Sequence, residues 1–274
     1  MLPVPYDVSM QPITVHDARE QLLAAGITGP HQSHSRANNL EKIRASLAGD
    51  PEATFGLSGL DRYQVHEILG FVAEVTGCSP DIELRDGYDT IDPDRTVSTI
   101  VAAGRRLGRA AAEGALLLAA TGHPTGMLEH HIHVVAAYRR AGGKVLRLRE
   151  EESLDIGRSG RHSEVRYVGG VGCLADWGTL RHTHSPAAME ALLEDGAWPD
   201  LVLGDHGFAG AAIEREITTV AVMDINDPPL AVAAAEQRDV TIIPMDDNRA
   251  PRRYEPAWRL LCQTIEETAS DQAK

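Results

Sequence analysis

The C-terminal two-thirds of the chain alternates short apolar runs with segments of helical periodicity, and this alternation constrains the fold more than any other feature. The runs are ALLLAAT, LVLG, TTVAVM and VTIIP, and each leads into a segment rich in Gly, Pro, Asp or Asn. Short apolar runs between turn residues predict strands that are buried on both faces. Helical segments of about a dozen residues between such strands indicate crossovers between parallel neighbours. The sequence therefore predicts an α/β fold with a doubly wound, mainly parallel sheet in a three-layer α/β/α arrangement.

The first part of the chain has a different pattern, because helical spacing recurs there without intervening strands. We predict helices over residues 17–25, 38–47 and 60–76, with Asp17 as the cap of the first. Residues 86–96 (DGYDTIDPDRT) are predicted to form a loop, and the roles of Asp89 and Asp92 in this Asp-rich turn are left open. Residues 1–96 are thus a mostly helical segment, either a cap over the site or part of the same domain. Residues 97–274 are the α/β domain that carries the active site.

The charge balance excludes some partners. The chain has 40 acidic and 26 basic residues, a net charge of −14, and no cluster of Lys and Arg, so we expect no nucleic acid partner. The longest apolar stretch, residues 114–120, is too short to span a bilayer, and the N-terminus lacks the pattern of a signal peptide. Three cysteines without a CxxC pair indicate reduced thiols. These features predict a cytoplasmic protein with no membrane partner, and a homodimer is expected only from the frequency of such assemblies.

Polar residues follow four of the predicted strands at the point where each strand ends. The four segments are TGHPTG, GDHG, DINDP and PMDDN. Ligands of open parallel sheets bind at the carboxyl ends of the strands. The sequence therefore predicts that these four segments meet in one active site.

The segment TGHPTG predicts a phosphate-binding turn, because glycines between a strand and a helix let backbone N–H groups point at an anion. The same residues also suit an ordinary tight turn, and both interpretations stay open. HTHSP places two imidazoles on one side of an extended segment, where they bind phosphate or metal or lie in a solvated loop. For His31 and His34 a solvated loop is preferred over a lid that contacts phosphate. The residues predicted to bind the substrate phosphate are Thr121, Gly122, Thr125, Gly126, His182, His184 and Asn248.

Carboxylates and an amide at GDHG and DINDP predict a site for a hard divalent cation, above all Mg²⁺ or Mn²⁺. Asp227 has a second interpretation, since an Asp before proline often caps a helix. Zinc fits less well, because HExxH spacing and clustered cysteines are absent from the sequence. The roles of Asp246 and Asp247 are left open. The predicted metal ligands are Asp205, Asp224, Asn226 and Asp227.

In their order along the chain, TGHPTGMLEHH, LGDHGFAG, MDINDPPLAVA and IPMDDNRAP resemble an actinobacterial family named phosphatase. The resemblance runs from about residue 86 to the C-terminus and depends on the joint presence of short motifs. It implies hydrolysis of phosphomonoesters and does not identify a substrate. The matching positions are His123, Thr125, Asp205, His206, Asp224, Asn226, Asp227 and residues 246–248.

We therefore predict a metal-dependent phosphatase that hydrolyses a small phosphorylated metabolite. His123 or His206 would be the catalytic acid or base, because imidazole titrates near neutral pH. The sequence contains no GxSxG elbow, so attack by water is expected rather than attack by a serine. Two alternatives stay open: a transferase or isomerase acting on a phosphosugar or nucleotide, and a non-catalytic metabolite-binding protein. The density of acidic residues favours an enzyme.

Overall fold

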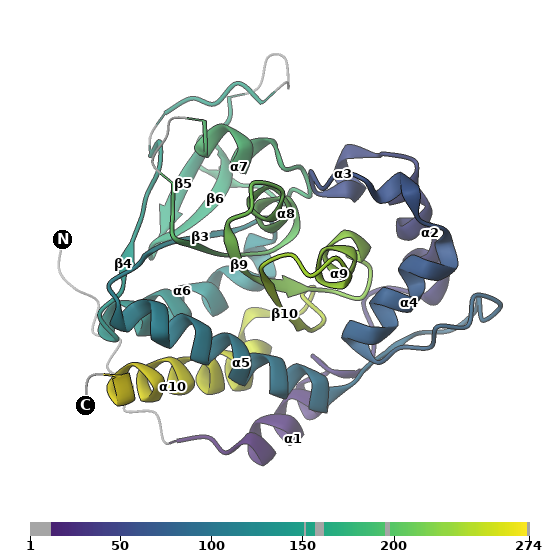
Figure 1. Cartoon of the computed structure of the whole chain (residues 1–274), viewed down its shortest axis with the longest axis horizontal. Coiled ribbons are helices and arrows are strands. Elements are labelled where there is room, and N and C mark those ends of the chain that lie inside the picture. Colours follow the sequence, from purple (N-terminus) through teal and green to yellow (C-terminus); the bar gives the residue numbers. More distant parts are fainter. Residues whose placement is uncertain (1–11, 151, 157–161, 195–197, 273–274) are drawn as a thin grey trace.

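The computed structural model describes residues 12–150, 152–156, 162–194 and 198–272. A mostly parallel sheet lies between helices on both of its faces (Figure 1), so the predicted three-layer α/β/α fold is confirmed. The strand order is β10-β9-β8-β3-β6-β5, with β4 beside β3 and β7 beside β6. The strands are β3 (Leu116–Thr121), β4 (Lys144–Val145), β5 (Glu164–Val168), β6 (Val171–Asp176), β7 (Thr179–Leu180), β8 (Leu201–Gly204), β9 (Thr218–Met223) and β10 (Val240–Pro244).

Strands β3, β6, β8, β9 and β10 run parallel, whereas β5 and β7 pair antiparallel with β6. The segment EVRYVGGVGCLADWG, residues 164–178, fits either one bent strand or a hairpin by its sequence, and the structure has a hairpin. Gly169 and Gly170 both have positive φ, 62° and 96°, at its turn. This conformation is nearly free of cost only for glycine, so the two glycines determine where the chain reverses.

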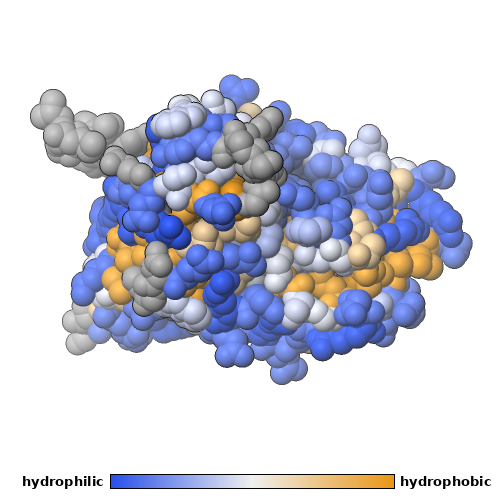
Figure 2. Space-filling view, turned by 90° about the horizontal axis from the view of Figure 1, so that it is seen from above, coloured by the Kyte–Doolittle hydropathy of each residue, from blue (hydrophilic) through white to orange (hydrophobic). Residues whose placement is uncertain are grey.

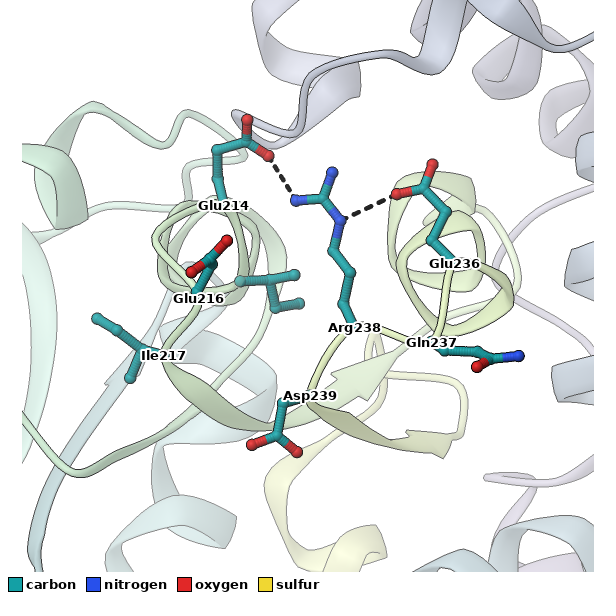
Figure 3. Close-up of a pocket in the computed structure, with 8 residues that line it drawn as sticks. Glu214, Glu216, Ile217, Glu236, Gln237, Arg238 and Asp239 are labelled. Atoms are coloured by element: carbon teal, nitrogen blue, oxygen red, sulfur yellow. Dashed lines mark hydrogen bonds and ion pairs between the residues drawn. The ribbon is translucent and has the colours of Figure 1, made fainter.

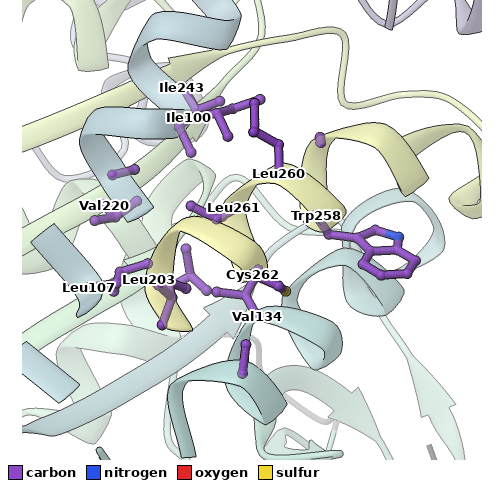
Figure 4. Packing of buried hydrophobic residues seen from close by; sticks show 14 of the residues in the cluster. Ile100, Leu107, Val134, Leu203, Val220, Ile243, Trp258, Leu260, Leu261 and Cys262 are labelled. Atoms are coloured by element: carbon purple, nitrogen blue, oxygen red, sulfur yellow. The ribbon is translucent and has the colours of Figure 1, made fainter. Parts of the chain in front are cut away.

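One face of the sheet is covered by the four helices α1 (Val15–Ala25), α5 (Pro93–Ala112), α6 (Pro124–Arg140) and α10 (Glu255–Gln272). Side chains from α5, such as Ile100 and Leu107, pack there against Val220 and Ile243 of the sheet and Leu261 of α10 (Figure 4). Successive strand residues point to opposite faces, so each strand supplies both cores.

The other face is covered by helices in two groups. Helices α7 (Ala187–Leu192) and α8 (His206–Glu214) pack on Leu118 and Val202 of the central strands. Helices α2 (Arg36–Leu47), α4 (Val65–Thr76) and α9 (Pro228–Ala235) share a separate cluster with the sheet near β9 and β10. The short elements are β1 (Gly29–Pro30), paired with β2 (Thr90–Ile91), α3 (Pro51–Thr54), and the 3₁₀ turns η1 (Leu60–Arg62) and η2 (Pro251–Tyr254).

The proposed division at residue 96 stays a prediction, and residues 1–11 of its first part lie outside the described residues. The helices before this boundary are not set apart from the sheet, because α1 belongs to the core of α5 and α10 while α2 and α4 pack with α9. The boundary also falls inside α5, which begins at Pro93.

Several predicted ends of elements were wrong. Helix α1 is capped by Thr14, whose hydroxyl accepts the N–H of Asp17, so Asp17 is not the cap. The helix predicted over residues 60–76 is a 3₁₀ turn followed by α4. The role of Asp92, which the sequence left open, is to cap α5, where its carboxylate accepts the N–H of Asp94 at 2.8 Å. Local capping decides these ends, and periodicity alone does not locate them.

Figure 2 shows a mostly hydrophilic face on which hydrophobic side chains gather in two separate areas. No helix in the described part of the chain is long and apolar enough to cross a bilayer. The free cysteines Cys78, Cys173 and Cys262 are all buried.

Candidate active site

The carboxyl ends of β3, β8, β9 and β10 lie at one edge of the sheet, and the polar segments that follow these strands meet there. Nε2 of His206, after β8, lies 3.0 Å from Oδ2 of Asp247, after β10, and 3.7 Å from Oδ2 of Asp227, after β9. Nδ1 of His123, after β3, lies 3.4 Å from Oδ1 of Asp247. The predicted convergence of four strand ends is therefore present in the fold.

Three groups of side chains at this edge have ligand atoms that all lie within 4.8 Å of one another, as the spacing of a metal site requires. Two groups pair one histidine with two carboxylates and are entirely buried. The third group consists of histidines only and has one exposed member. The first group is His31, Asp224 and Asp246; the second is His206, Asp227 and Asp247; the third is His123, His182 and His206.

The first group is assembled around His31, which follows the two-residue strand β1. Its Nε2 lies 2.7 Å from Oδ1 of Asp224 and 3.8 Å from Oδ2 of Asp246. Ser33 donates its hydroxyl to Asp246 at 2.7 Å and so holds this carboxylate in place. His34 stands beside the group, with Nε2 3.7 Å from Oδ2 of Asp224 and 27% of its side chain exposed. Burial lowers the pKa of His31, but Asp224 and Asp246 outweigh burial and raise it to about 9.

The second group contains Asp227, and its carboxylate does not cap helix α9. Oδ2 of Asp227 instead accepts the backbone N–H of Asp224 at 3.0 Å, and no cap hydrogen bond comes from its side chain. Complete burial and the neighbouring carboxylates raise the pKa of Asp227 to about 8, against the opposing effect of His206. Burial lowers the pKa of His206, but Asp227 and Asp247 raise it to about 10.

The third group brings together histidines from the ends of β3, β7 and β8. The rings of His123 and His182 stack with centroids 4.5 Å apart. Nε2 of His184 lies 3.0 Å from Nε2 of His182, so His184 orients its neighbour. Burial and nearby imidazoles lower the pKa of His182 to about 4 and that of His184 to about 2, which leaves both rings neutral at pH 7.

The centre buries four carboxylates that have no Lys or Arg among their recorded ion-pair partners. Asp224, Asp227, Asp246 and Asp247 are all buried, and every ion pair recorded for them has a histidine as its partner. Such groups are costly to bury unless they are paired or bind metal.

Buried ligand atoms without a hydrogen-bond partner point to the same conclusion. Within the described residues these atoms include Oδ2 of Asp224, Oδ1 of Asp227, Oδ2 of Asp247 and Nδ1 of both His123 and His206. Oδ2 of Asp247 receives no properly directed hydrogen bond although Nε2 of His206 is only 3.0 Å away. Atoms that converge without hydrogen-bond geometry are typical of metal ligands. The residues present therefore fit divalent cations.

Some predicted ligands lie outside the three groups. Both oxygens of Asp205 are engaged, because Oδ2 accepts the hydroxyl of Thr121 at 2.5 Å and Oδ1 accepts the N–H of Gly122 at 2.6 Å. Asp205 thus fastens the end of β3 to the end of β8. Asn226 is buried and belongs to none of the groups.

The predicted phosphate-binding residues are also divided. Gly126 packs so closely that a Cβ there would lie 2.3 Å from the carbonyl oxygen of Asp247. Thr125 and Asn248 are exposed, and Asn248 donates its N–H to Asp246 at 3.0 Å. Thr121 and Gly122 serve the contact with Asp205, and His182 and His184 lie at the third group.

The structure also corrects two expectations about histidines. Adjacent residues of a helix do not face the same way, so the sequence predicts at least one of His130 and His131 at the surface. Both are instead fully buried, with their Nδ1 atoms 3.0 Å apart. His31, expected in a solvated loop, is buried in the first group.

Asp89 has a structural role, since its carboxylate pairs with buried Arg36 at 2.8 Å and accepts the side-chain amide N–H of Asn39 at 2.7 Å.

Sequence reasoning did not identify His31 as a candidate metal ligand, because the two-residue strand β1 is too short to recognise. The only signal in the sequence was the HxxH spacing after Pro30.

A pocket at the opposite end of β9 and β10 is separate from this centre (Figure 3). Arg238 stands in it between Glu214 of α8 and Glu236, which follows α9, at 2.7 and 2.9 Å. Its other lining residues are Ile213, Glu216, Ile217, Gln237 and Asp239. Glu214, Glu236 and Arg238 are paired with one another, and Asp239 pairs with Arg106 outside the pocket, so we assign it no chemistry.

The fold and the site define an α/β protein with a buried histidine–aspartate centre at the carboxyl ends of its parallel strands, where ligands of such sheets bind. A family model named Phosphatase matches residues 13–269. The chain belongs to this family, in agreement with the resemblance found in the sequence and with the prediction of a hydrolase acting on phosphate esters. It is also 35% identical over 262 residues to Phosphatase SCO2771 of Streptomyces coelicolor. This alignment covers 93% of this chain and 95% of the relative.

Proposed function

We propose that the protein is a metal-dependent phosphatase that hydrolyses monoesters of a small phosphorylated metabolite. The observation that carries the proposal is the set of four buried carboxylates whose ion-pair partners are all histidines. When its histidines are neutral, as metal ligation requires, the carboxylates would repel a phosphate dianion unless cations balance them. Family membership supplies the reaction class, and the centre supplies the reason for metal dependence.

The first group (His31, Asp224, Asp246) and the second group (His206, Asp227, Asp247) would each hold one divalent cation. Bound cations would polarise the phosphoryl oxygens and activate water. Each group mixes imidazole with carboxylate, which favours Mn²⁺ over Mg²⁺ and also suits Fe²⁺, Co²⁺ or Zn²⁺. From carboxylates and one amide, the sequence predicted Mg²⁺ or Mn²⁺ without a choice between them.

Protonation of the leaving alkoxide needs a side chain that is not itself a metal ligand and can therefore carry a proton. His123 and His206, the two histidines predicted for this task, both lie within the candidate metal groups. His34 lies outside them, is partly exposed, and has Nε2 3.7 Å from Asp224. We therefore assign proton transfer to His34 in this proposal. Phe55, which packs on His184 and His206, would exclude water beside these two histidines.

The proposal is tested by measuring phosphate release from a panel of sugar, nucleotide and amino-alcohol phosphates. The protein is stripped with EDTA and reloaded separately with Mg²⁺, Mn²⁺, Co²⁺ or Zn²⁺. Activity that EDTA removes and one metal restores supports the proposal. Asp224→Asn should abolish this activity and reduce bound metal, whereas Asp61→Asn, at an exposed position, should change neither. If the wild type releases no phosphate with any metal and substrate, a transferase or a non-catalytic binding protein would be favoured.

A further inference from the structure

The third group differs chemically from the two buried carboxylate groups. His123, His182 and His206 come from three different strand ends, and their ligand nitrogens lie within 4.8 Å of one another without any carboxylate among them. Three imidazoles with a fourth position left open are a donor set that zinc and similar cations accept. The proposed function uses only the other two groups, so this one has no assigned task.

Unpartnered atoms and a supporting residue indicate that the group is built to bind a cation. Nδ1 of His123 and Nδ1 of His206 are buried and have no hydrogen-bond partner among the described residues. Nε2 of His206 faces Asp247 in the second group, so its Nδ1 is the ring nitrogen left for the third. His184 contacts His182 at 3.0 Å, as a residue that orients a metal ligand does.

The charge of the group suggests what such a cation would do. In the first and second groups a divalent cation would be neutralised by two carboxylates. In the third group no carboxylate would be a ligand. His206 would bridge to the second cation as an imidazolate after losing its ring proton, so the third cation would share one anionic ligand and keep most of its charge. Two carboxylates lie beside the group. Asp247, which belongs to the second group, is 3.0 Å from Nε2 of His206 and 3.4 Å from Nδ1 of His123. Oδ1 of Asp205 is 3.7 Å from Nδ1 of His206, but it already accepts the N–H of Gly122.

The retained charge would attract a phosphate dianion, and the position of the group also suits the capture of phosphate. Its member His182 is exposed, whereas every member of the other two groups is buried. A substrate arriving from solvent would therefore meet the third group first. We propose that His123, His182 and His206 form a third cation site, which takes Zn²⁺ or a similar cation and binds the phosphate group of the substrate. This inference rests on the proposed function and adds to it a separate site for phosphate capture.

The test counts metal ions on the full chain. Wild type, His182→Gln and the control His66→Gln, which changes an exposed histidine of α4, are stripped, reloaded with Zn²⁺ and measured by mass spectrometry of the metal. We expect one ion per group, three in wild type and in the control, and two in His182→Gln. Binding of inorganic phosphate to the zinc-loaded protein, measured by calorimetry, should weaken at least about tenfold in His182→Gln only.

Two results would overturn the inference. If wild type and His182→Gln bind the same number of ions, or if phosphate affinity is unchanged, the third group is not a cation site, while EDTA-sensitive phosphatase activity would leave the proposed function standing. If wild type binds no metal at all, both proposals fail. Should His182→Gln not fold by circular dichroism, His184→Gln replaces it, and we then expect weaker binding of one ion while two remain tight.

Discussion

At the scale of single residues, the centre depends on side chains that are buried with fewer partners than they need. Oδ2 of Asp224, Oδ1 of Asp227 and Oδ2 of Asp247 are buried acceptors without a donor among the described residues. A buried acceptor without a donor costs about 1–3 kcal/mol. The sequence retains several of them in one place, which is consistent with selection for binding at the expense of stability.

Asp205 allows the roles of ligand and positioning residue to be separated. We expect Asp205→Asn to keep the full number of bound metal ions but to lose about 1–3 kcal/mol of stability, because an amide cannot accept from both Thr121 and Gly122. Turnover should fall through kcat, since His123 and His206 follow the two strand ends that Asp205 joins. Metal analysis, thermal unfolding and steady-state kinetics measure the three effects.

The conservative variant Thr121→Ser keeps the hydroxyl that Asp205 accepts and should stay close to wild type. Loss of one metal ion from Asp205→Asn would instead support the sequence-based assignment of Asp205 as a ligand.

At the scale of elements, helices α5 and α10 approach closely because small residues line their contact. A Cβ at Gly108 of α5 would lie 2.7 Å from the carbonyl oxygen of Ile265 and 2.7 Å from Cβ of Thr268. We expect Gly108→Ala to destabilise the protein by about 1–3 kcal/mol through this overlap, as chemical denaturation would measure.

The matched control is Gly70→Ala in α4, where an added Cβ meets no atom within 4 Å. It should stabilise by up to about 1 kcal/mol, because alanine is the better helix former. Equal effects of the two substitutions would contradict close packing of α5 on α10.

The ion-pair cluster of Figure 3 joins the ends of α8 and α9 at the edge of the sheet away from the centre. Burial opposes the shift, but hydrogen bonds from Ser58 and Arg238 hold the pKa of Glu214 below its ordinary value of 4.5. A carboxylate with a lowered pKa stabilises the fold at neutral pH and loses this contribution as pH falls through its folded pKa.

Arg238→Gln should therefore lower the free energy of unfolding at pH 7 by about 1 kcal/mol or less. The difference in the free energy of unfolding between this variant and wild type should become smaller as the pH is lowered below 4.5, the ordinary pKa of Glu214 and Glu236. Urea unfolding at several pH values measures this. A difference that grows on acidification would show that Arg238 acts through something other than these carboxylates.

At the scale of the whole molecule, cations that bind the folded chain alone would raise its stability by mass action. At a free metal concentration of 100 times Kd, the gain is about 2.7 kcal/mol for each bound cation, or roughly 5–10 °C in Tm per cation for a chain of this size. We expect this shift when Mn²⁺ or Zn²⁺ is added to the stripped protein in a thermal unfolding experiment. The double variant Asp224→Asn with Asp227→Asn should lose most of it, and a full shift in that variant would place the cations elsewhere.

Much of the fold was predictable because it depends on local patterns. Short apolar runs predicted β3, β8, β9 and β10, and the turn residues after them predicted the edge that carries the centre. Boundaries were less accurate. The segment KVLRLRE predicts a strand over residues 144–150, whereas β4 has only two residues, Lys144–Val145. The extent of such an edge strand depends on its pairing with β3, which periodicity does not encode.

The sequence by itself determined the fold class, the family, and the strand ends at which His123, His206, Asp224 and Asp227 meet, because these follow from periodicity and turn chemistry close along the chain. Only the tertiary structure decided which side chains share a group. His31 and Asp224 are 193 positions apart, and no local pattern connects them. The tertiary structure also turned Asp205 towards the end of β3, since a side chain's partners depend on which strands are neighbours in the sheet.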